Sequence, residues 1–395
     1  MSGVHARLSP SGADGWMNCV QWASDSVGST YARRGNAAHE LAARLLHNGG
    51  SARGCIGEVL TVEGEAFTVD DDMADTIDCY VDYVRTFRDT HVQMVEVRVP
   101  IEQITGEPGA HGTVDALLIS KDCTEVVVVD LKTGAGVQVD AERNRQMQFY
   151  ALGALEFLKL IGHSPDSVRL VISQPKVSRM PSEWATDVPT LREFALDASA
   201  AAMRYGLGDS TPGETQCRWC SQSGTCSALA ARVQAEVGAQ LEDLGTEDKG
   251  RQDELLRGLT SAADIARAMA AVGLVEDWCS AIRAEAERRL KSGAEVAGFK
   301  LVAGKRGIRA WADPASAEAA IAAVLSDHAF ERTLVSPTKA ERLLRDNAPG
   351  WQQLLPLITQ AEGKPSVART HDKRPALEFR PVADQFHDET GADLA

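Results

Sequence analysis

The chain has 395 residues, of which 44% are hydrophobic and 25% are charged, a composition close to that of an average globular protein. This length suits two domains, or one domain with a long appendage, better than a single ordinary domain. The net charge of −15 disfavours a passive nucleic-acid coat, which is normally basic, but it does not exclude an enzyme that acts on DNA.

The sequence offers no candidate for a membrane or targeting segment. No apolar run reaches the roughly 18 residues that a membrane helix needs, so we expect no membrane span. Residues 1–12 lack a basic start followed by an apolar stretch, so we expect no secretory signal and a cytoplasmic location. In that compartment disulfides are rare, and clustered cysteines more often bind metal.

The first half of the chain is predicted to contain helices, then strands, then both. Ser9-Pro10 is a typical start of a short helix. Apolar residues at helical spacing predict four further helices: 36–47, 72–90, 140–161 and 189–205. Segments rich in β-branched residues predict four strands: 92–99, 113–120, 125–132 and 168–173. We therefore expect an α/β core with a mixed central sheet flanked by helices.

The composition changes beyond this core. A loop rich in Gly, Ser and Thr at 208–216 leads to a group of cysteines, and residues 228–292 are rich in Ala, Glu and Arg and compatible with helix. We expect a small hairpin around Lys305-Arg306-Gly307 and more helices between 313 and 360. The chain is therefore predicted to have three parts: a domain over 1–230, a mainly helical region over 231–363 and a disordered tail over 364–395.

The strands at 113–120 and 125–132 bring three charged side chains together. If their turn is centred on Asp122-Cys123, residue i pairs with residue 245 − i, and Asp115 lies opposite Asp130. Alternation along the second strand places Lys132 on the same face as Asp130. Two buried carboxylates repel each other, and a divalent cation such as Mg²⁺ compensates best for that repulsion. From these residues alone an alternative stays equally open, in which both aspartates lie at strand ends in solvent and Lys132 is a surface ion-pair partner.

Three motifs resemble those of RecB-like PD-(D/E)XK nucleases. Gly112-Thr113-Val114-Asp115 followed by Asp130-Leu131-Lys132-Thr133-Gly134 is similar to the D…(D/E)xK signature. Gln146 and Tyr150 match the QxxxY element, and Gly35-Asn36-Ala37-Ala38-His39-Glu40 resembles the GxxxHE helix. The resemblance covers about residues 5–230 and implies a restriction-endonuclease-like core that hydrolyses DNA with Mg²⁺ or Mn²⁺. Glu96 fits an ordinary strand position equally well, and we leave it out of the predicted site.

The same resemblance implies a role for each residue. The implied metal ligands are His39, Asp115, Asp130 and the Leu131 carbonyl. Lys132 would help to activate water and to stabilise developing charge. Gln146 and Tyr150 would orient the lysine, the water or the scissile strand.

Three of the eight cysteines form a tight set, Cys217-x₂-Cys220-x₅-Cys226, that lacks a fourth thiolate. An ordinary zinc module would bring a second CxxC pair, and the sequence has none. Iron–sulfur members of the RecB-like family combine such a set with a lone N-terminal cysteine, so the resemblance implies Cys19 as the fourth ligand of a [4Fe–4S] cluster. The family often has proline after that cysteine, where this chain has Val20. A structural Zn²⁺ and unliganded thiols stay open as alternatives.

The layout also resembles a phage nuclease family in which this domain precedes a helical region and a tail similar to Glu362-Gly363-Lys364-Pro365 and Asp372-Lys373-Arg374-Pro375. That resemblance implies an exonuclease that processes double-stranded DNA ends beside a single-strand annealing protein in phage recombination. Two other roles for the helical region stay open, a homo-oligomer contact and a DNA clamp. Its candidate contacts are Trp278, Trp311, Trp351 and the Lys305-Arg306 turn, with core tryptophans and a solvated turn as the alternative. A catalytically silent DNA-binding or assembly module with a Cys₄ metal site is the alternative function, because a fold alone does not decide the chemistry.

Overall fold

The computed structural model describes residues 6–24, 30–237, 262–302, 314–325, 334–344 and 347–359, together with Pro375. The chain divides into two compact units, residues 1–303 and 304–395. The first unit extends past residue 230, where we predicted a domain boundary, because Leu274 of one late helix packs against Leu229 and Val233 of the preceding one. No helix within the described ranges is long and apolar enough to cross a membrane.

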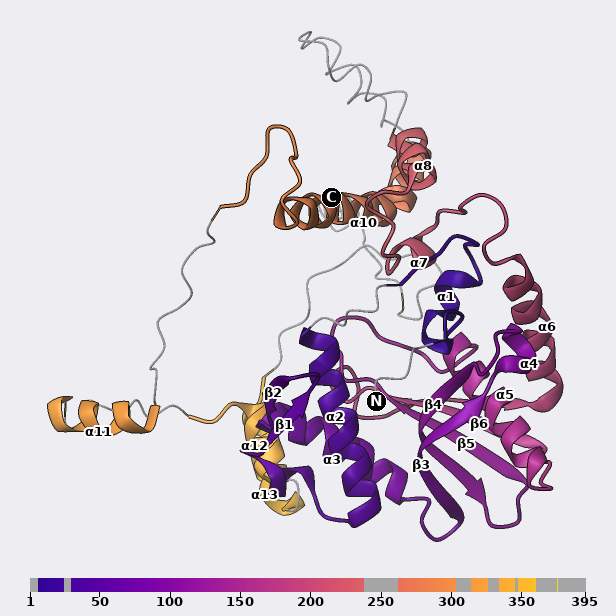
Figure 1. Ribbon diagram of the computed structural model, residues 1–395. Coiled ribbons are helices and arrows are strands. Elements are labelled where there is room, and N and C mark those ends of the chain that lie inside the picture. The colour runs from indigo at the N-terminus through magenta and orange to yellow at the C-terminus, as the bar shows by residue number, and fades with distance from the viewer. Residues whose placement is uncertain are drawn as a thin grey trace, which may run out of the picture. The chain divides into compact units, whose positions relative to one another are not determined.

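A five-stranded mixed sheet forms the centre of the first unit (Figure 1). Its strands, in sheet order, are β3 (His91–Pro100), β4 (His111–Ser120), β5 (Glu125–Leu131), β6 (Ser167–Ser173) and β7 (Ser182–Asp187). β5 and β6 are parallel, and the other neighbouring strands are antiparallel. The predicted α/β core with a mixed sheet is therefore confirmed.

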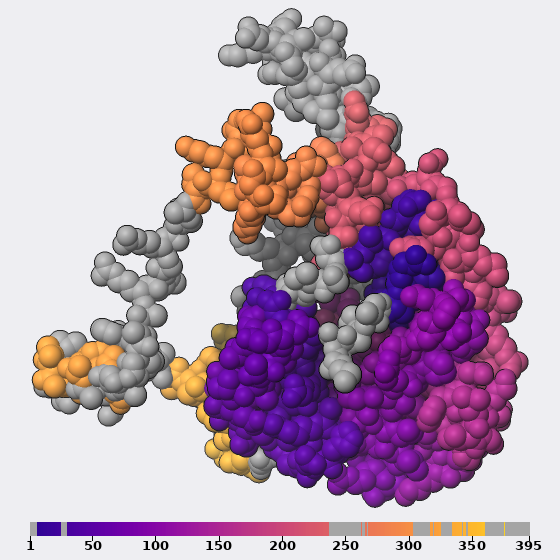
Figure 2. All heavy atoms as spheres, in the orientation of Figure 1, coloured from indigo at the N-terminus to yellow at the C-terminus, as the bar shows by residue number. Residues whose placement is uncertain are grey.

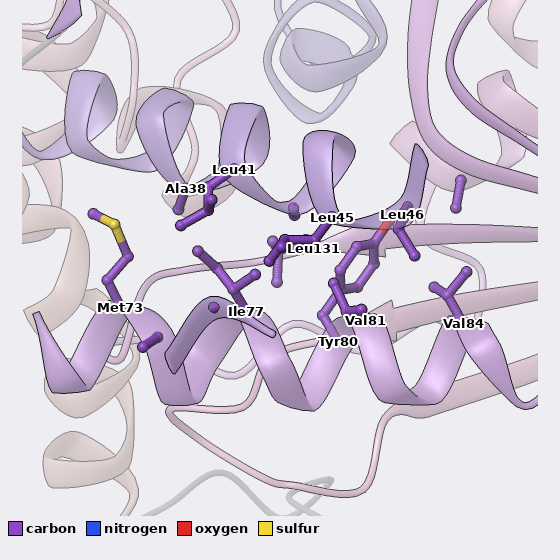
Figure 3. Close-up of a cluster of buried hydrophobic side chains, with 14 of the residues drawn as sticks. Ala38, Leu41, Leu45, Leu46, Met73, Ile77, Tyr80, Val81, Val84 and Leu131 are labelled. Atoms are coloured by element: carbon purple, nitrogen blue, oxygen red, sulfur yellow. The ribbon is translucent and has the colours of Figure 1, made fainter. Parts of the chain in front are cut away.

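Helices cover both faces of this sheet (Figure 1). On one face lie α2 (Thr30–Asn48) and α3 (Asp71–Arg85), and on the other lies α5 (Arg145–Leu160), with α6 (Val188–Arg204) beside it. Figure 3 shows side chains of α2 and α3 pointing toward each other, with Leu131 of β5 between them. Leu131 is 1% exposed, so the residue between Asp130 and Lys132 anchors that strand in the core.

The remaining elements of the first unit are mostly short, apart from the long helix α10 (Ala262–Lys291). They are η1 (Pro10–Gly12), α1 (Ala13–Trp16), η2 (Ala52–Cys55), β1 (Val59–Val62), β2 (Glu65–Thr68), α4 (Glu102–Thr105), α7 (Glu214–Cys217), α8 (Ser227–Val237) and α10. β1 and β2 form a separate antiparallel hairpin. Trp278 of α10 is half-buried and packs against the cluster that joins α8 and α10, which agrees with the interpretation of this residue as a core side chain.

The described part of the second unit is helical, as predicted for the C-terminal region. Its elements are α11 (Pro314–Leu325), α12 (Pro337–Leu343), α13 (Ala348–Leu354) and η6 (Leu355–Leu357). Three predictions fall outside the described residues: the hairpin around Lys305-Arg306-Gly307, the role of Trp311 and the tail from residue 364, of which Pro375 alone is described.

Gly153 allows α5 to approach β3 closely. A β-carbon at this position would lie 2.8 Å from the carbonyl oxygen of Pro100, which is a backbone atom that cannot easily move aside. We therefore expect Gly153→Ala to lower the free energy of unfolding by about 1–3 kcal/mol, measured by urea denaturation. Gly273→Ala in α10 is the matched control, because its added β-carbon would meet no atom within 4 Å. Equal stability of the two variants would contradict the packing described.

Candidate functional site

β4 and β5 pair in the predicted register. Ala116 pairs with Val129 and Ile119 with Val126, so the residue numbers of each pair sum to 245, as 116 + 129 and 119 + 126 show. One further step along both strands places Asp115 opposite Asp130. The Asp115 side chain is 13% exposed and that of Asp130 is 4% exposed, so the alternative of two solvent-exposed aspartates is wrong.

Asp115 also binds the backbone of β5. Its Oδ2 accepts a hydrogen bond from the Leu131 amide at 2.7 Å. This bond holds the carboxylate of one strand against the backbone of the other, just beyond the last regular pair of the ladder. The position of Asp115 relative to β5 is therefore fixed by a backbone contact as well as by the register.

β3 adds a third acid to this pair. The β3–β4 ladder is interrupted at one position, where Glu96 lies opposite Asp115. Glu96 has a φ of 53°, a left-handed conformation that costs a non-glycine residue about 1–2 kcal/mol. Regular alternation along a strand would place Val114 and Ala116 of β4 on the same face of the sheet. They instead pack in the hydrophobic clusters on opposite faces. The strands are therefore distorted where the two acids meet.

Helix α2 brings His39 to these acids. Its Nδ1 lies 3.1 Å from Asp115 Oδ1. His39, Glu96 and Asp115 each offer one ligand atom, and these atoms all lie within 4.8 Å of one another. Within the described ranges this is the only group of three or more His, Cys, Asp or Glu side chains that meets that limit. Asp130, a predicted ligand, lies outside the group, whereas Glu96, which we left out, lies inside it.

The acids and the histidine shift the pKa values of one another. Burial and the charge of Asp115 raise the pKa of Glu96 to about 6. Burial also raises the pKa of Asp130, with Lys132 opposing and Asp115 reinforcing that rise. Burial by itself lowers the pKa of His39, but the hydrogen bond to Asp115 and the charges of the acids outweigh it, so this pKa is raised. A bound divalent cation would relieve the repulsion among the carboxylates.

A chain of polar contacts fixes Lys132 beside Asp130. Lys132 Nζ lies 2.9 Å from Asp130 Oδ2 and donates a hydrogen bond to Gln146 Oε1, also at 2.9 Å. The Gln146 amide in turn donates to the Tyr150 hydroxyl at 2.8 Å and, over 3.4 Å, to Asp130 Oδ1. Asp130 Oδ2 is buried and, apart from this ion pair, has no hydrogen-bond donor with good geometry among the described residues. The structure thus brings the predicted QxxxY residues to the predicted aspartate and lysine.

Four cysteines meet at one pocket. Cys19 follows α1, Cys217 ends α7, and Cys220 and Cys226 follow in the next loop, and all four line the same small pocket. Figure 2 shows the segment of α1 directly beside the segment that contains α7. Burial raises the pKa of the Cys217 thiol, and the three neighbouring cysteines raise it further. The predicted meeting of Cys19 with the distant Cys217–Cys226 set is therefore present.

The surroundings of these sulfurs suit thiolate ligands. Backbone amides donate to three of the sulfurs at 3.4 Å: Thr211 to Cys19, Gly213 to Cys217 and Leu229 to Cys226. Such bonds stabilise thiolates at metal centres.

Residues 5–375 match the model of a family described as a protein of unknown function, DUF2800. The chain belongs to this family. The matched range of this DUF2800 protein contains the His39 group, the Asp130–Lys132 pair and all four pocket cysteines. The chain is also similar to a solved structure titled "Crystal structure of SSO0001", with 18% identity over 38% of this chain and 67% of that one. The TM-score of that match is 0.21, which is too low to define a shared fold.

Proposed function

We propose that this DUF2800 protein is a metal-dependent deoxyribonuclease of the RecB-like PD-(D/E)XK kind. The observation that carries the proposal is the convergence of His39, Glu96 and Asp115 beside the buried Asp130–Lys132 pair. Acids that repel one another in a buried place need a compensating charge, and an amine fixed beside them provides a second functional group for hydrolysis.

The residues fit a divalent cation. Carboxylate oxygens and an imidazole nitrogen are ligands that Mn²⁺ accepts, and carboxylates suit Mg²⁺. Asp130 Oδ2 is a further buried oxygen whose partner among the described residues is the Lys132 ammonium, so Asp130 stays a predicted ligand, as does the Leu131 carbonyl. When bound, the cation would polarise the phosphoryl group and make a water molecule more acidic.

The remaining residues would position the reacting groups. Lys132 would donate to the water or to a phosphoryl oxygen on which negative charge develops. Asp130 and Gln146 hold its ammonium from two elements, β5 and α5, so little reorganisation is needed when substrate binds. Tyr150 orients the Gln146 amide through a hydrogen bond of 2.8 Å.

We also propose that Cys19, Cys217, Cys220 and Cys226 hold a [4Fe–4S] cluster. Their shared pocket and the amides that donate to three of the sulfurs support a thiolate-bound metal group. The resemblance to iron–sulfur members of the RecB-like family favours a cluster over a single Zn²⁺. The cluster would join the α1 segment to the segment after α6. Its role would be structural, because it closes a long loop around the catalytic sheet.

The resemblance to RecB-like phage nucleases suggests the ends of double-stranded DNA as substrate and a single-strand annealing protein as partner. Cluster-loaded protein should shorten end-labelled linear duplex in the presence of Mg²⁺, leave closed circular duplex intact, and do neither in EDTA. Cleavage of the closed circle would indicate an endonuclease. No cleavage of either DNA with Mg²⁺ or Mn²⁺ would contradict the enzyme and favour the catalytically silent module.

Metal binding should stabilise the fold because it relieves repulsion among the three acids. At a Mn²⁺ concentration about 100 times Kd, linkage gives about 2.7 kcal/mol, which corresponds to an increase of roughly 5–10 °C in the thermal midpoint of a domain of this size. Differential scanning calorimetry of cluster-loaded protein with and without Mn²⁺ measures this increase. Glu96→Gln should reduce it, and an unchanged midpoint in the native protein would contradict the cation site.

A further inference from the structure

The loop between Cys217 and Cys220 presents two large side chains to solvent. The Trp219 side chain is 73% exposed, whereas the other tryptophans within the described ranges are buried or half-buried. The guanidinium of Arg218 lies 5.4 Å from the centre of the Trp219 ring. Among the described residues no carboxylate forms an ion pair with Arg218. An exposed indole with a stacked cation is therefore available to a ligand.

These two side chains border a hollow of about 430 Å³ between the cysteine loop and α10. The α10 side of the hollow includes Glu285 and Arg288. Gly224 allows the loop to lie directly on α10, because a β-carbon there would be 2.7 Å from the Ala281 carbonyl oxygen. We call this hollow the Trp219 groove.

The charge of the Trp219 groove favours an anionic ligand. It contains two guanidinium groups, Arg218 and Arg288, against one carboxylate, Glu285. Glu285 is paired at 2.7 Å with both Arg288 and Arg289, and these hydrogen bonds lower its pKa to about 2. Glu285 therefore stays ionised and paired with α10 arginines, and the Arg218 guanidinium faces no competing acid. Apart from the cysteine ligands, the side chains that line the groove therefore carry one more positive than negative charge, on a chain whose net charge is −15.

We propose that the Trp219 groove binds single-stranded DNA, with one base stacked on Trp219 and the adjoining phosphate bound by Arg218. A nucleotide combines a flat ring with an anion, which matches the indole and the guanidinium. Internal base pairs of a duplex are stacked on both faces and cannot cover the indole, so away from duplex ends the groove favours a single strand. This inference rests on the proposed nuclease function. It adds that the loop between Cys217 and Cys220 binds DNA in single-stranded form.

The test uses full-length, cluster-loaded protein that carries Asp130→Asn, so that bound DNA is not cut. Fluorescence anisotropy measures its affinity for a labelled oligothymidylate and for a duplex of equal length. Trp219→Ala should weaken single-strand binding about tenfold, Trp219→Phe should retain most of it, and duplex binding should stay unchanged. Arg218→Ala should also lower the salt dependence of single-strand binding by about 0.7 in the log–log slope. Arg192→Ala, an exposed arginine on α6, is the matched control.

Absorbance near 400 nm must be equal in all variants, which shows that the neighbouring cluster is intact. The inference is overturned if the parent, Trp219→Ala and Arg218→Ala proteins bind the single strand with equal affinity. It is also overturned if the two variants lose as much affinity for the duplex as for the single strand. Quenching of tryptophan fluorescence by an acidic aromatic peptide but not by the oligonucleotide, with the quenching lost in Trp219→Phe, would overturn the inference and assign the groove to a protein partner. If Mg²⁺-dependent cleavage persists in the Asp130-containing protein while Trp219→Ala binds single strands normally, this inference fails and the nuclease proposal stands.

Discussion

Asp130→Asn should reduce the rate of Mg²⁺-dependent DNA hydrolysis by on the order of 10³-fold while leaving DNA affinity almost unchanged. The substitution keeps the shape of a side chain that is 4% exposed and removes the anion that lies 2.9 Å from Lys132 Nζ. Lys132 then loses the charge that holds it beside the metal ligands, and the cation loses a predicted ligand. Steady-state cleavage of end-labelled duplex gives the rate, and anisotropy with Ca²⁺ in place of Mg²⁺ gives the affinity.

Asp197→Asn is the matched control for this experiment. Asp197 is exposed on α6, so the same change of charge there should alter the rate less than twofold. Both variants should have native thermal midpoints within a few degrees of each other. Cleavage by Asp130→Asn at the rate of the control would show that the buried acid takes no part in the chemistry.

Cys217→Ser should abolish absorbance near 400 nm and destabilise the first unit by on the order of 5 kcal/mol. The loop that Cys19 and Cys217 would close spans 198 positions, 217 − 19, and the entropy lost by the unfolded chain on cross-linking grows with the logarithm of that number. The substitution also leaves the three remaining cysteines without a complete ligand set. Anaerobic purification followed by absorbance and urea denaturation measures both effects.

Cys279→Ser provides the comparison, because Cys279 is half-buried on α10 and does not line the cysteine pocket. That variant should keep the absorbance and nearly all of the stability. If the wild-type protein contains stoichiometric zinc and has no absorbance band near 400 nm, the four cysteines bind zinc and the cluster assignment is wrong. Equal unfolding free energies for Cys217→Ser and the native protein would show that no group joins the two segments.

The register of β4 and β5 could be predicted because a short polar turn and two apolar strands leave a single pairing that buries both. The placement of Asp130 and Lys132 follows from that register. Glu96 could not be predicted in the same way, because its contribution depends on a left-handed φ of 53° that no alternation pattern reveals. The sequence shows Glu96 only as an acid between Val95 and Val97. Strands that carry no functional site often have the same pattern, so it does not identify a site residue.

Other differences have similar local causes. β7 was missed because its residues, Ser182 to Asp187, are mostly polar at the edge of the sheet. α5 begins at Arg145 rather than Asp140, because the Asn144 side chain accepts a hydrogen bond from the Met147 amide and so caps the helix there. The pairing of Cys19 with Cys217 came from family resemblance, since nothing in the spacing of one lone cysteine identifies a partner so far along the chain.

The central claim is that the acids form a cation site. It is tested by titrating Mn²⁺ into protein that holds its cluster but no divalent cation, with electron paramagnetic resonance used to measure the unbound ion. We predict saturable binding by the native chain and an affinity at least tenfold weaker in Asp115→Asn, whose amide oxygen can still accept the Leu131 hydrogen bond and so preserve the fold. Absence of saturable Mn²⁺ binding by the native chain, or the same affinity in both proteins, would contradict the account.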